Sequence, residues 1–307
     1  MSMEDRDGWI WFDGAWMPWR DARVHVMTHT LHYGLGCFEG LRAYSTADGP
    51  AIFRLAEHVD RLFDSARILG LELDFDRATV AHACCAAVAR NGLEEAYVRP
   101  LVFLGADKAG IDPAGAACHL SIAAWPWGSY LGKDGLATGI RVKISSFARH
   151  HVNAHMRGAK SISTYTNSIM ACREVRAEGF DEALLLDTDG FVAEGPGENV
   201  FLVRRGVLVE PEPTAALDGI TRRTIHVLAR EAGYAVTARR ITRDELYIAD
   251  EVFFTGTAAE VTPVVEIDRR PVGDGRPGTV TRDLQSRYFA CTGGRDPAHM
   301  DWLTRCG

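Results

Sequence analysis

The sequence lacks the cysteine pattern of a disulfide framework or a zinc ribbon. Its seven cysteines are an odd number, and no two of them form a Cys-x-x-Cys pair. Disulfide-rich domains and zinc ribbons both depend on cysteines that are paired at short spacing. We therefore expect the cysteines of this chain to be buried or idle thiols.

Long apolar runs and an excess of positive charge are also missing. No segment approaches the roughly 20 apolar residues of a membrane-spanning helix. The acidic N-terminus MSMEDRDGWIWFDG lacks the basic and apolar regions of a signal peptide. The formal charge is -7, and the lysines and arginines are scattered along the chain. These features favour a cytoplasmic protein that binds neither membranes nor nucleic acid.

Three common binding and catalytic signatures are missing as well. Gly34-Leu35-Gly36 does not continue as Gly-x-Gly-x-x-Gly and lacks a surrounding βαβ unit, which argues against a dinucleotide site. His151 and His155 have the spacing of a metal-binding pair, but no carboxylate partner accompanies them. Nothing resembles the Gly-x-Ser-x-Gly motif of serine hydrolases. The sequence predicts no metal site.

The length and the alternation of patterns predict an α+β fold with two domains. At 307 residues the chain exceeds the size at which a single hydrophobic core usually stops growing. A hydrophobic content of 47% and a charged content of 24% are typical of a soluble globular protein. We expect a smaller N-terminal domain over 1–125, a glycine-rich interdomain loop over 126–138 and a larger C-terminal domain over 139–307.

Apolar periodicity predicts the elements of both domains. In the first we expect a hairpin around Asp13-Gly14, helices over 55–71 and 76–93, and strands over 97–105 and 119–127. In the second we expect a strand over 140–150, helices over 161–179, 220–234 and 242–249, and strands over 250–268. A meander is predicted over 181–211, with turns at 188–190 and 204–206.

Lys160 is the most informative residue when it is read together with three other segments. An amine attacks an aldehyde only in its neutral form, whereas a lysine side chain has an ordinary pKa of about 10.4 and is charged at neutral pH. Burial beside a positive charge and apolar walls makes such an amine a nucleophile and a proton carrier. Lys160 is the only lysine between Lys143 and the C-terminus, so a C-terminal domain that holds pyridoxal phosphate (PLP) has few alternatives.

Glu194 is the candidate partner for the pyridine nitrogen of PLP. It follows strand residues and precedes a Gly-Pro-Gly turn, which lets the backbone approach a ligand closely. A carboxylate at that nitrogen keeps it protonated, and the ring can then accept electrons. Glu198 is the nearest alternative for this role.

Two further segments predict a phosphate site. In LDGIT (217–221) a loop enters a helix, so the free N-H groups of Ile220 and Thr221 can bind an anion. Thr257 offers a hydroxyl group, and Arg61 offers a positive charge. Each of these residues alone is ordinary, and only their combination with Lys160 and Glu194 indicates PLP.

These residues and their surroundings resemble the branched-chain-amino-acid aminotransferases among the fold-type IV PLP enzymes. The resemblance covers nearly the whole chain and is carried by THTLHYGLGCFEGLRAY, FRLAEHVDRLFDSA, AYVRPLVF, AAWPWGSYLG, the Lys160 region, DEALLLDTDGFVAEGPGENVF, LDGITRRTI and ADEVFFTGTAAEVTP. It implies a fold like that of D-amino-acid aminotransferase, with the active site between two domains, and a homodimer or higher homo-oligomer. The implied reaction transfers the amino group of leucine, isoleucine or valine to 2-oxoglutarate, which gives the branched 2-oxo acid and L-glutamate.

The resemblance also implies a role for each matching residue. Lys160 corresponds to the Schiff-base lysine, Glu194 to the partner of the pyridine nitrogen and Tyr165 to a tyrosine near the phenolic oxygen of PLP. The residues that correspond to phosphate ligands are Arg61, Ile220, Thr221 and Thr257. Those that correspond to substrate contacts are Tyr97, Thr257, Ala258 and Ala259 at the α-carboxylate, Tyr33, Phe38, Trp127 and Tyr130 at the side chain, and Arg99 at the distal carboxylate of glutamate.

Two positions differ from the family pattern. Ser161-Ile162-Ser163-Thr164 stands where relatives often have a glycine-rich stretch, and Ala109 replaces a larger apolar residue in a loop that lines the pocket. Two alternatives follow. One is a fold-type IV enzyme of other specificity, such as an aminodeoxychorismate lyase or a D-amino-acid aminotransferase, against which GTAAE and the LHYG/FEG segment argue. The other is a noncatalytic PLP-binding protein, which the altered 161–164 stretch favours.

Overall fold

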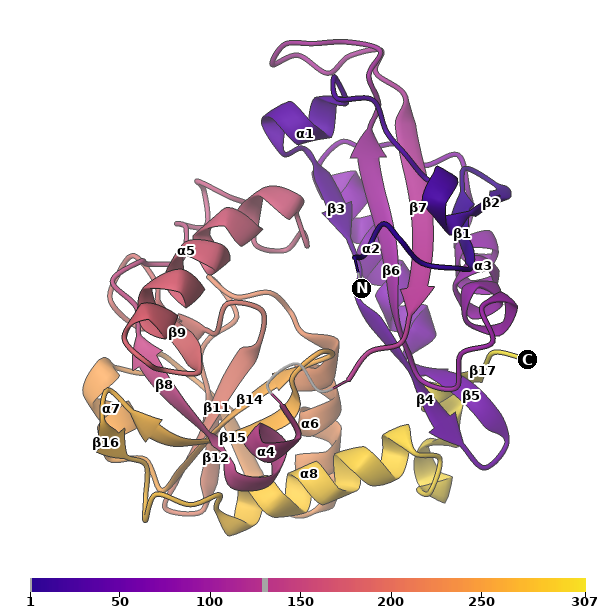
Figure 1. Ribbon diagram of the computed structural model, residues 1–307. Helices are drawn as coiled ribbons and strands as arrows, with labels where there is room; N and C mark the ends of the chain where they lie inside the picture. Colours follow the sequence, from indigo (N-terminus) through magenta and orange to yellow (C-terminus); the bar gives the residue numbers. More distant parts are fainter. Residues whose placement is uncertain (1, 129–131) are drawn as a thin grey trace. The chain divides into compact units, whose positions relative to one another are not determined.

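A computed structural model describes residues 2–128 and 132–307, which form two compact units (Figure 1). Unit 1 comprises the described residues up to Trp127, together with Ala159–Ser163 and Cys291–Gly307, and unit 2 comprises the rest. The predicted division had placed 159–163 and 291–307 in the C-terminal domain. They pack in unit 1 because Ser161 forms a β-bridge with Cys37 and because the C-terminal strand pairs with a strand of that unit.

Unit 1 is built on an antiparallel sheet. Its strands are β1 (Trp9–Phe12), β2 (Ala15–Pro18), β3 (Gly36–Phe38), β4 (Leu41–Thr46), β5 (Gly49–Phe53), β6 (Ala96–Leu104), β7 (Cys118–Trp125) and β17 (Leu303–Arg305). Their order in the sheet is β17-β5-β4-β6-β7-β1-β2, and β3 pairs with β6. The first hairpin is confirmed: Phe12 pairs with Ala15 across Asp13 and Gly14, whose φ angles of 46° and 89° suit a tight two-residue turn.

Helices α2 (Leu55–Ile68) and α3 (Arg77–Arg90) lie against this sheet and confirm both predicted helices. Asp76 starts α3, because its carboxylate accepts a hydrogen bond from the N-H of Thr79 at 2.7 Å. Apolar side chains of both helices and of β4, β6 and β7 form the core of unit 1. The shorter helices of this unit are η1 (Trp19–Asp21), α1 (His29–Tyr33) and η3 (Pro297–Trp302).

Unit 2 is built on a mixed sheet. Its strands are β8 (Ile140–Ile144), β9 (Glu182–Leu186), β10 (Val192–Glu194), β11 (Asn199–Arg204), β12 (Val207–Glu210), β13 (Ala235–Ala238), β14 (Glu251–Gly256), β15 (Glu260–Ile267) and β16 (Arg270–Pro271). Their order is β10-β9-β8-β15-β14-β11-β12-β13, and β16 pairs with β15. The helices of unit 2 are α4 (Gly132–Thr138), α5 (Tyr165–Ala177), α6 (Ile220–Glu231) and α7 (Arg243–Tyr247). Two more, η2 (Ile162–Thr164) and α8 (Thr279–Thr292), have residues in both units.

Two expectations about these segments are wrong. The stretch 181–211 is no meander, because β8, β15 and β14 lie between its hairpins β9-β10 and β11-β12. Local periodicity identifies strands but carries no information on which strands pair. The segment 126–138, predicted as a loop, contains helix α4, which packs against β15.

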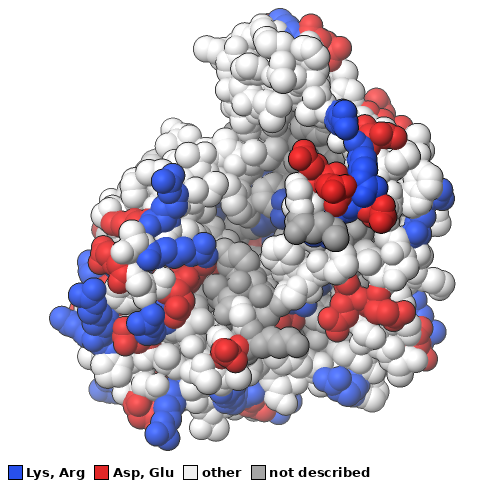
Figure 2. All heavy atoms as spheres, in the orientation of Figure 1, with Lys and Arg blue, Asp and Glu red and all other residues white. Residues whose placement is uncertain are grey.

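The surface carries charges of both signs. On the face shown in Figure 2, lysine and arginine side chains are interspersed with aspartate and glutamate side chains. A mixture of this kind gives no strong field of one sign on that face. No helix in the described ranges combines the length and the apolar character that a membrane span requires.

Candidate active site

The backbone of Lys160 is held in unit 1 from two sides. Its N-H donates to Ser65 Oγ of α2 at 3.0 Å, and its carbonyl accepts from the N-H of Phe38 at 3.1 Å. The adjacent residue, Ser161, is buried and bridges to Cys37 of β3. These contacts fix the position of Lys160 without using its own side chain.

The side chains of Lys160 and Arg99, both predicted site residues, lie near the aromatic ring of Phe38. The Nζ atom of Lys160 lies 5.1 Å from the centroid of the Phe38 ring, and the guanidinium carbon of Arg99 lies 4.3 Å from it. Both distances fit cation-π contacts. Arg99 also donates from Nη2 to the hydroxyl of Tyr97 at 3.2 Å. Four predicted site residues are therefore neighbours within unit 1.

Aromatic rings enclose the Tyr97 end of this cluster. The centroids of Trp125 and Trp127 each lie 5.3 Å from that of Tyr97. A side chain at Gly40 would clash with the Tyr97 hydroxyl, so this position requires glycine. Trp127 Nε1 and Arg99 Nε are buried and have no hydrogen-bond partner among the described residues. Buried donors of this kind are normally satisfied, which makes them candidates for binding a ligand.

Arg61 belongs to a buried network whose other members were missed by sequence reasoning. Its Nε and Nη2 atoms donate to the two carboxylate oxygens of Glu39 at 2.6 and 3.0 Å. Burial by itself would raise the pKa of Glu39, but Arg61 and His58 hold it well below its usual range. Burial lowers the pKa of His58, whose Nδ1-H therefore donates to Glu39 as a neutral ring at 2.7 Å.

The 161–164 stretch, which differs from the family pattern, packs against Gly34 and Gly36. These two glycines therefore have a packing role, although they form no dinucleotide motif. A Cβ atom at Gly36 would lie 2.6 Å from Ile162 Cδ1, and one at Gly34 would lie 3.2 Å from Ser163 Cβ. The missing side chains of these two glycines thus accommodate residues bulkier than glycine after Lys160. The bulkier residues after Lys160 therefore have space in unit 1.

The remaining pocket predictions in unit 1 are less enclosed. Tyr33 is 46% exposed, and its hydroxyl accepts from the N-H of Gly110 at 3.0 Å. Ala109, in the same loop as Gly110, is exposed. Tyr130 lies outside the described residues.

In unit 2, the buried carboxylate of Glu194 forms ion pairs with two arginines and accepts a hydrogen bond from a backbone N-H. Arg149 Nε lies 2.9 Å from Oε1, Arg157 Nη2 also pairs with Oε1, and the N-H of Leu217 donates to Oε2 at 3.0 Å. Sequence reasoning missed both arginines, because nothing in ARHHVNAHMRG pairs them with a carboxylate so distant along the chain. Glu194 is therefore an oriented carboxylate within a salt-bridge network.

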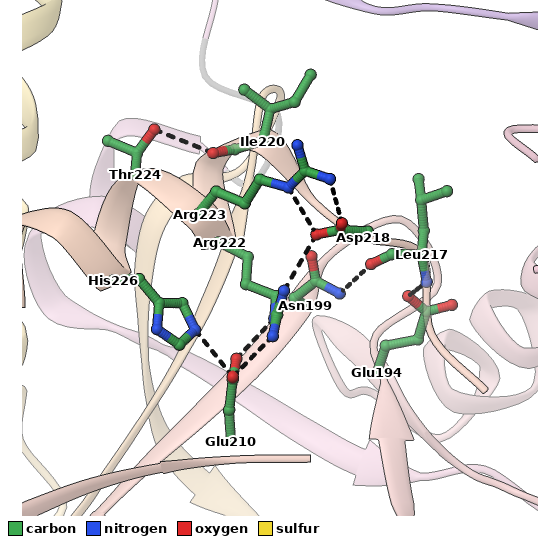
Figure 3. A network of polar contacts seen from close by, with 10 residues as sticks. All are labelled: Glu194, Asn199, Glu210, Leu217, Asp218, Ile220, Arg222, Arg223, Thr224 and His226. Carbon is green, nitrogen blue, oxygen red and sulfur yellow. Dashed lines mark hydrogen bonds and ion pairs between the residues drawn. The ribbon is translucent and has the colours of Figure 1, made fainter. Parts of the chain in front are cut away.

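The predicted phosphate loop is tied directly to Glu194 (Figure 3). The backbone of Leu217 donates to Glu194 and accepts from Asn199 Nδ2 at 2.8 Å. Asp218 accepts from Arg222 and Arg223, and Arg222 is held in turn by Glu210. This network, completed by a contact between His226 and Glu210, sets the start of α6 relative to Glu194.

The first turn of α6 fits an anion. Ile220 and Thr221 are buried there, and Gly219 precedes them as a cap that has no side chain to occupy their N-H groups. A side chain at Gly219 would clash with Asn199. Unpaired N-H groups and the helix dipole favour a phosphate at such an end.

The other predicted residues of unit 2 lie at the ends of two elements. Thr257, Ala258 and Ala259 form the turn between β14 and β15, and the carbonyl of Ala259 accepts from the Thr262 hydroxyl at 2.6 Å. Tyr165 is the first residue of α5 and is half-buried.

The two candidate carboxyl groups, Glu194 and Glu198, differ in their electrostatic surroundings. Burial raises the pKa of Glu198 to about 8, and the nearby carboxyl of Glu182 adds to the rise. Glu198 therefore carries a proton near neutral pH, whereas Glu194 pairs with two arginines. Only a carboxylate can hold the proton of a pyridine nitrogen, so these surroundings favour Glu194.

The raised pKa of Glu198 predicts a pH-dependent stability. The pKa of Glu198 is about 8 in the folded chain and 4.5 ordinarily, so between these pH values the folded chain retains a proton that the unfolded chain has lost. The contribution of Glu198 to the free energy of unfolding is complete below about pH 4.5. Above that pH it falls by roughly 1.4 kcal/mol per pH unit, and it is lost once the pH has risen through about 8. We expect urea midpoints between pH 5 and 9 to fall less for Glu198→Gln than for the parent. Parallel curves would contradict this assignment.

Known proteins resemble the chain over nearly its full length. Residues 36–267 match the family model described as amino-transferase class IV. A branched-chain-amino-acid aminotransferase from Pseudomonas aeruginosa is 55% identical over 304 residues, with 99% of each chain covered.

Solved structures are similar as well. A branched-chain amino acid aminotransferase from Escherichia coli has a TM-score of 0.96 at 42% identity, with 98% of this chain and 100% of the other covered. The PLP form of a branched-chain amino acid aminotransferase from Thermobaculum terrenum has a TM-score of 0.92 at 33% identity, with 98% of this chain and 99% of the other covered.

These similarities confirm the resemblance and the fold class that were predicted from the sequence. Identity of 55% extends through both units, and the structural match includes both sheets. The chain belongs to the branched-chain-amino-acid aminotransferases of the class IV aminotransferase family.

Proposed function

We propose that the protein transfers the amino group of leucine, isoleucine or valine to 2-oxoglutarate with PLP as its cofactor. The observation that carries the proposal is the Phe38 ring, which Lys160 and Arg99 both contact. An aliphatic side chain can pack on aromatic rings there, and a distal carboxylate can pair with Arg99. One cluster thus serves both kinds of substrate.

The described residues fit PLP in three respects. The uncapped start of α6 offers N-H groups for the phosphate, and Arg61 brings a positive charge that Glu39 holds in place. Glu194 is a buried carboxylate whose orientation is fixed. We assign the phosphate to Arg61, Ile220, Thr221 and Thr257, and the phenolic oxygen to Tyr165. When bound, PLP accepts the electron pair that is released as the substrate Cα-H bond breaks.

Residues of the protein account for the other parts of the proposed reaction. Lys160 would hold the cofactor by condensing with its aldehyde, with loss of water, and would carry the proton that leaves the substrate Cα. Glu194 holds the proton at the pyridine nitrogen. Tyr97 and the backbone at 257–259 orient the α-carboxylate of the substrate.

A half-reaction screen tests this function. The PLP-loaded protein is mixed with each proteinogenic L-amino acid and with D-isomers as controls, while cofactor absorbance and 2-oxo acid release are followed. We expect leucine, isoleucine, valine and glutamate to react and their D-isomers to remain inert. Reaction with D-alanine but not L-leucine would indicate the D-specific alternative, and an unchanged spectrum would indicate a binding protein.

Arg99→Ala is expected to separate the two substrate classes. If Arg99 contacts only the distal carboxylate, glutamate turnover should lose the value of a charge-assisted hydrogen bond, about 1.5 to 3 kcal/mol or roughly 10- to 150-fold. Leucine turnover should change much less, because its side chain packs on Phe38 and Trp127. The measurement is kcat/KM of each half reaction, with Arg99→Lys as a control that keeps the charge. An equal loss for both amino acids would place Arg99 in a structural role.

We also propose that the protein is a homodimer or a larger assembly of dimers. Within the described residues, unit 1 exposes a stretch of large side chains over 24–33, including Val26 at 74% and Leu31 at 65%. Several large apolar side chains exposed within one short segment are typical of interfaces. Light scattering should give a multiple of 33.7 kDa. Leu31→Asp should lower the mass, whereas Ile248→Asp, at an exposed position of unit 2, should not.

A further inference from the structure

Three metal-ligating side chains converge where the chain leaves α8. Cys291 lies near the end of that helix, Asp296 caps η3, and His299 lies within η3. One ligand atom from each residue lies within 4.8 Å of the other two. Cys291 and His299 are buried, while the side chain of Asp296 is 26% exposed. All three belong to unit 1 and are separate from the residues assigned to PLP and substrate.

Local backbone structure creates this convergence. Gly294, with a φ of 66°, turns the chain after α8, and its N-H donates to the carbonyl of Cys291 at 3.1 Å. The backbone of His299 has non-helical angles of φ -126° and ψ 27°, and its ring stacks on Trp302 at 3.8 Å. The imidazole is therefore held in place by packing.

One of the distances matches a tetrahedral zinc ion, and a second is slightly longer. Zinc-ligand bonds of about 2.0 to 2.3 Å at tetrahedral angles separate neighbouring ligand atoms by about 3.3 to 3.6 Å. The Sγ atom of Cys291 lies 3.4 Å from Asp296 Oδ2, and His299 Nε2 lies 4.0 Å from the same oxygen. A hydrogen bond from the thiol accounts for the first distance, whereas the second is too long for a hydrogen bond. Zinc binding would bring His299 Nε2 and Asp296 Oδ2 closer together by about 0.5 Å.

The two carboxylate oxygens of Asp296 have different partners. Oδ1 accepts from the N-H of Ala298 at 3.0 Å and caps η3, whereas Oδ2 faces Cys291 and His299. The cap thereby orients the second oxygen toward the other two ligands. An outer contact of this kind is what positions a metal-binding carboxylate.

We propose that Cys291, Asp296 and His299 form a Zn²⁺ site. A thiolate with an imidazole and a carboxylate suits zinc, whereas Mg²⁺ and Ca²⁺ prefer sites made only of oxygen. Three protein ligands leave the fourth position to water, which the exposed side of Asp296 admits. Binding transfers the thiol proton of Cys291 to solvent as the sulfur-zinc bond forms. The ion joins the end of α8 to the segment before β17 and stabilises that segment.

Calorimetric titration of the PLP-loaded protein with Zn²⁺ tests this proposal. We expect one ion per chain, and an observed enthalpy that varies with the ionisation enthalpy of the buffer because the thiol proton is released. Cys291→Ser should weaken binding at least tenfold. Asp296→Asn should also weaken binding, although asparagine preserves the helix cap. Cys306→Ser is the matched control, because it removes another buried thiol of the same C-terminal segment and should leave the affinity unchanged.

Cadmium provides a second, spectroscopic readout. Thiolate coordination gives Cd²⁺ an ultraviolet absorption band, which should appear in the parent and in Cys306→Ser but not in Cys291→Ser. Stoichiometric Zn²⁺ binding that survives Cys291→Ser, or a parent protein that binds no Zn²⁺, would overturn the proposal. Should Cys291→Ser fail to fold, Asp296→Asn and the anomalous signal of zinc in crystals of the parent decide the question.

Discussion

Lys160→Ala should abolish aminotransferase turnover while the chain remains folded. The substitution removes the nucleophile and the proton carrier together, and proton transfer alone contributes about 10² to 10⁴-fold. We therefore expect a loss of at least about 10⁴-fold in the leucine half reaction. The fold should persist, because Ser65 and Phe38 bind the backbone of Lys160.

The small number of lysines makes the site of cofactor attachment easy to verify. The chain has four, at positions 108, 133, 143 and 160. Borohydride reduction of the PLP-loaded protein followed by peptide mapping should label Lys160 alone. Lys143→Ala is the matched control, because Lys143 pairs with Glu178 and has no assigned catalytic role. It should retain both label and activity. Undiminished turnover of Lys160→Ala would refute the assignment of this residue.

Glu194→Gln should reduce both stability and the rate of Cα-H cleavage. The carboxylate accepts hydrogen bonds from Arg157 on one oxygen and from the N-H of Leu217 on the other, so an amide places an N-H group against one donor in either orientation. Two buried arginines also lose their counter-charge, and breaking a buried ion pair costs about 3 to 5 kcal/mol. We expect PLP to remain bound but the isolated leucine half reaction to slow by roughly 10- to 150-fold, the value of one charge-assisted hydrogen bond.

Glu198→Gln is the matched control for this prediction. Because burial raises the pKa of Glu198 to about 8, glutamine replaces a group that is already neutral near pH 7. The same substitution should therefore have little effect on the half-reaction rate at that pH. Stopped-flow absorbance of both variants distinguishes the two residues. A larger rate loss in Glu198→Gln than in Glu194→Gln would reverse their roles.

The Glu39 network explains why the predicted phosphate ligand Arg61 is held so firmly. Its guanidinium binds Glu39 through two donors, and Glu39 also accepts from His58. Nothing in the local pattern of α2 predicts this arrangement, because Glu39 lies 22 residues before Arg61. A charged residue between the apolar strands β3 and β4 was the only available signal.

The sequence by itself determined the family, the fold class and most individual elements of this protein. Contiguous segments such as LDGIT and GTAAE could be interpreted locally, because glycine and threonine, with a helix start in LDGIT, predict a phosphate-binding backbone without distant partners. The hairpin at Asp13-Gly14 and helices α2 and α3 were predictable for the same reason, since turn residues and helical periodicity act over a few residues.

Only the tertiary structure decided which distant groups meet. It inserted β8, β15 and β14 between the two hairpins of the presumed meander, and it placed Arg149 and Arg157 at Glu194. It also brought Cys291, Asp296 and His299 together, although their spacing matches no standard metal motif. Strand order and buried charge pairs depend on the free energy of packing the whole chain, which no local pattern of residues encodes.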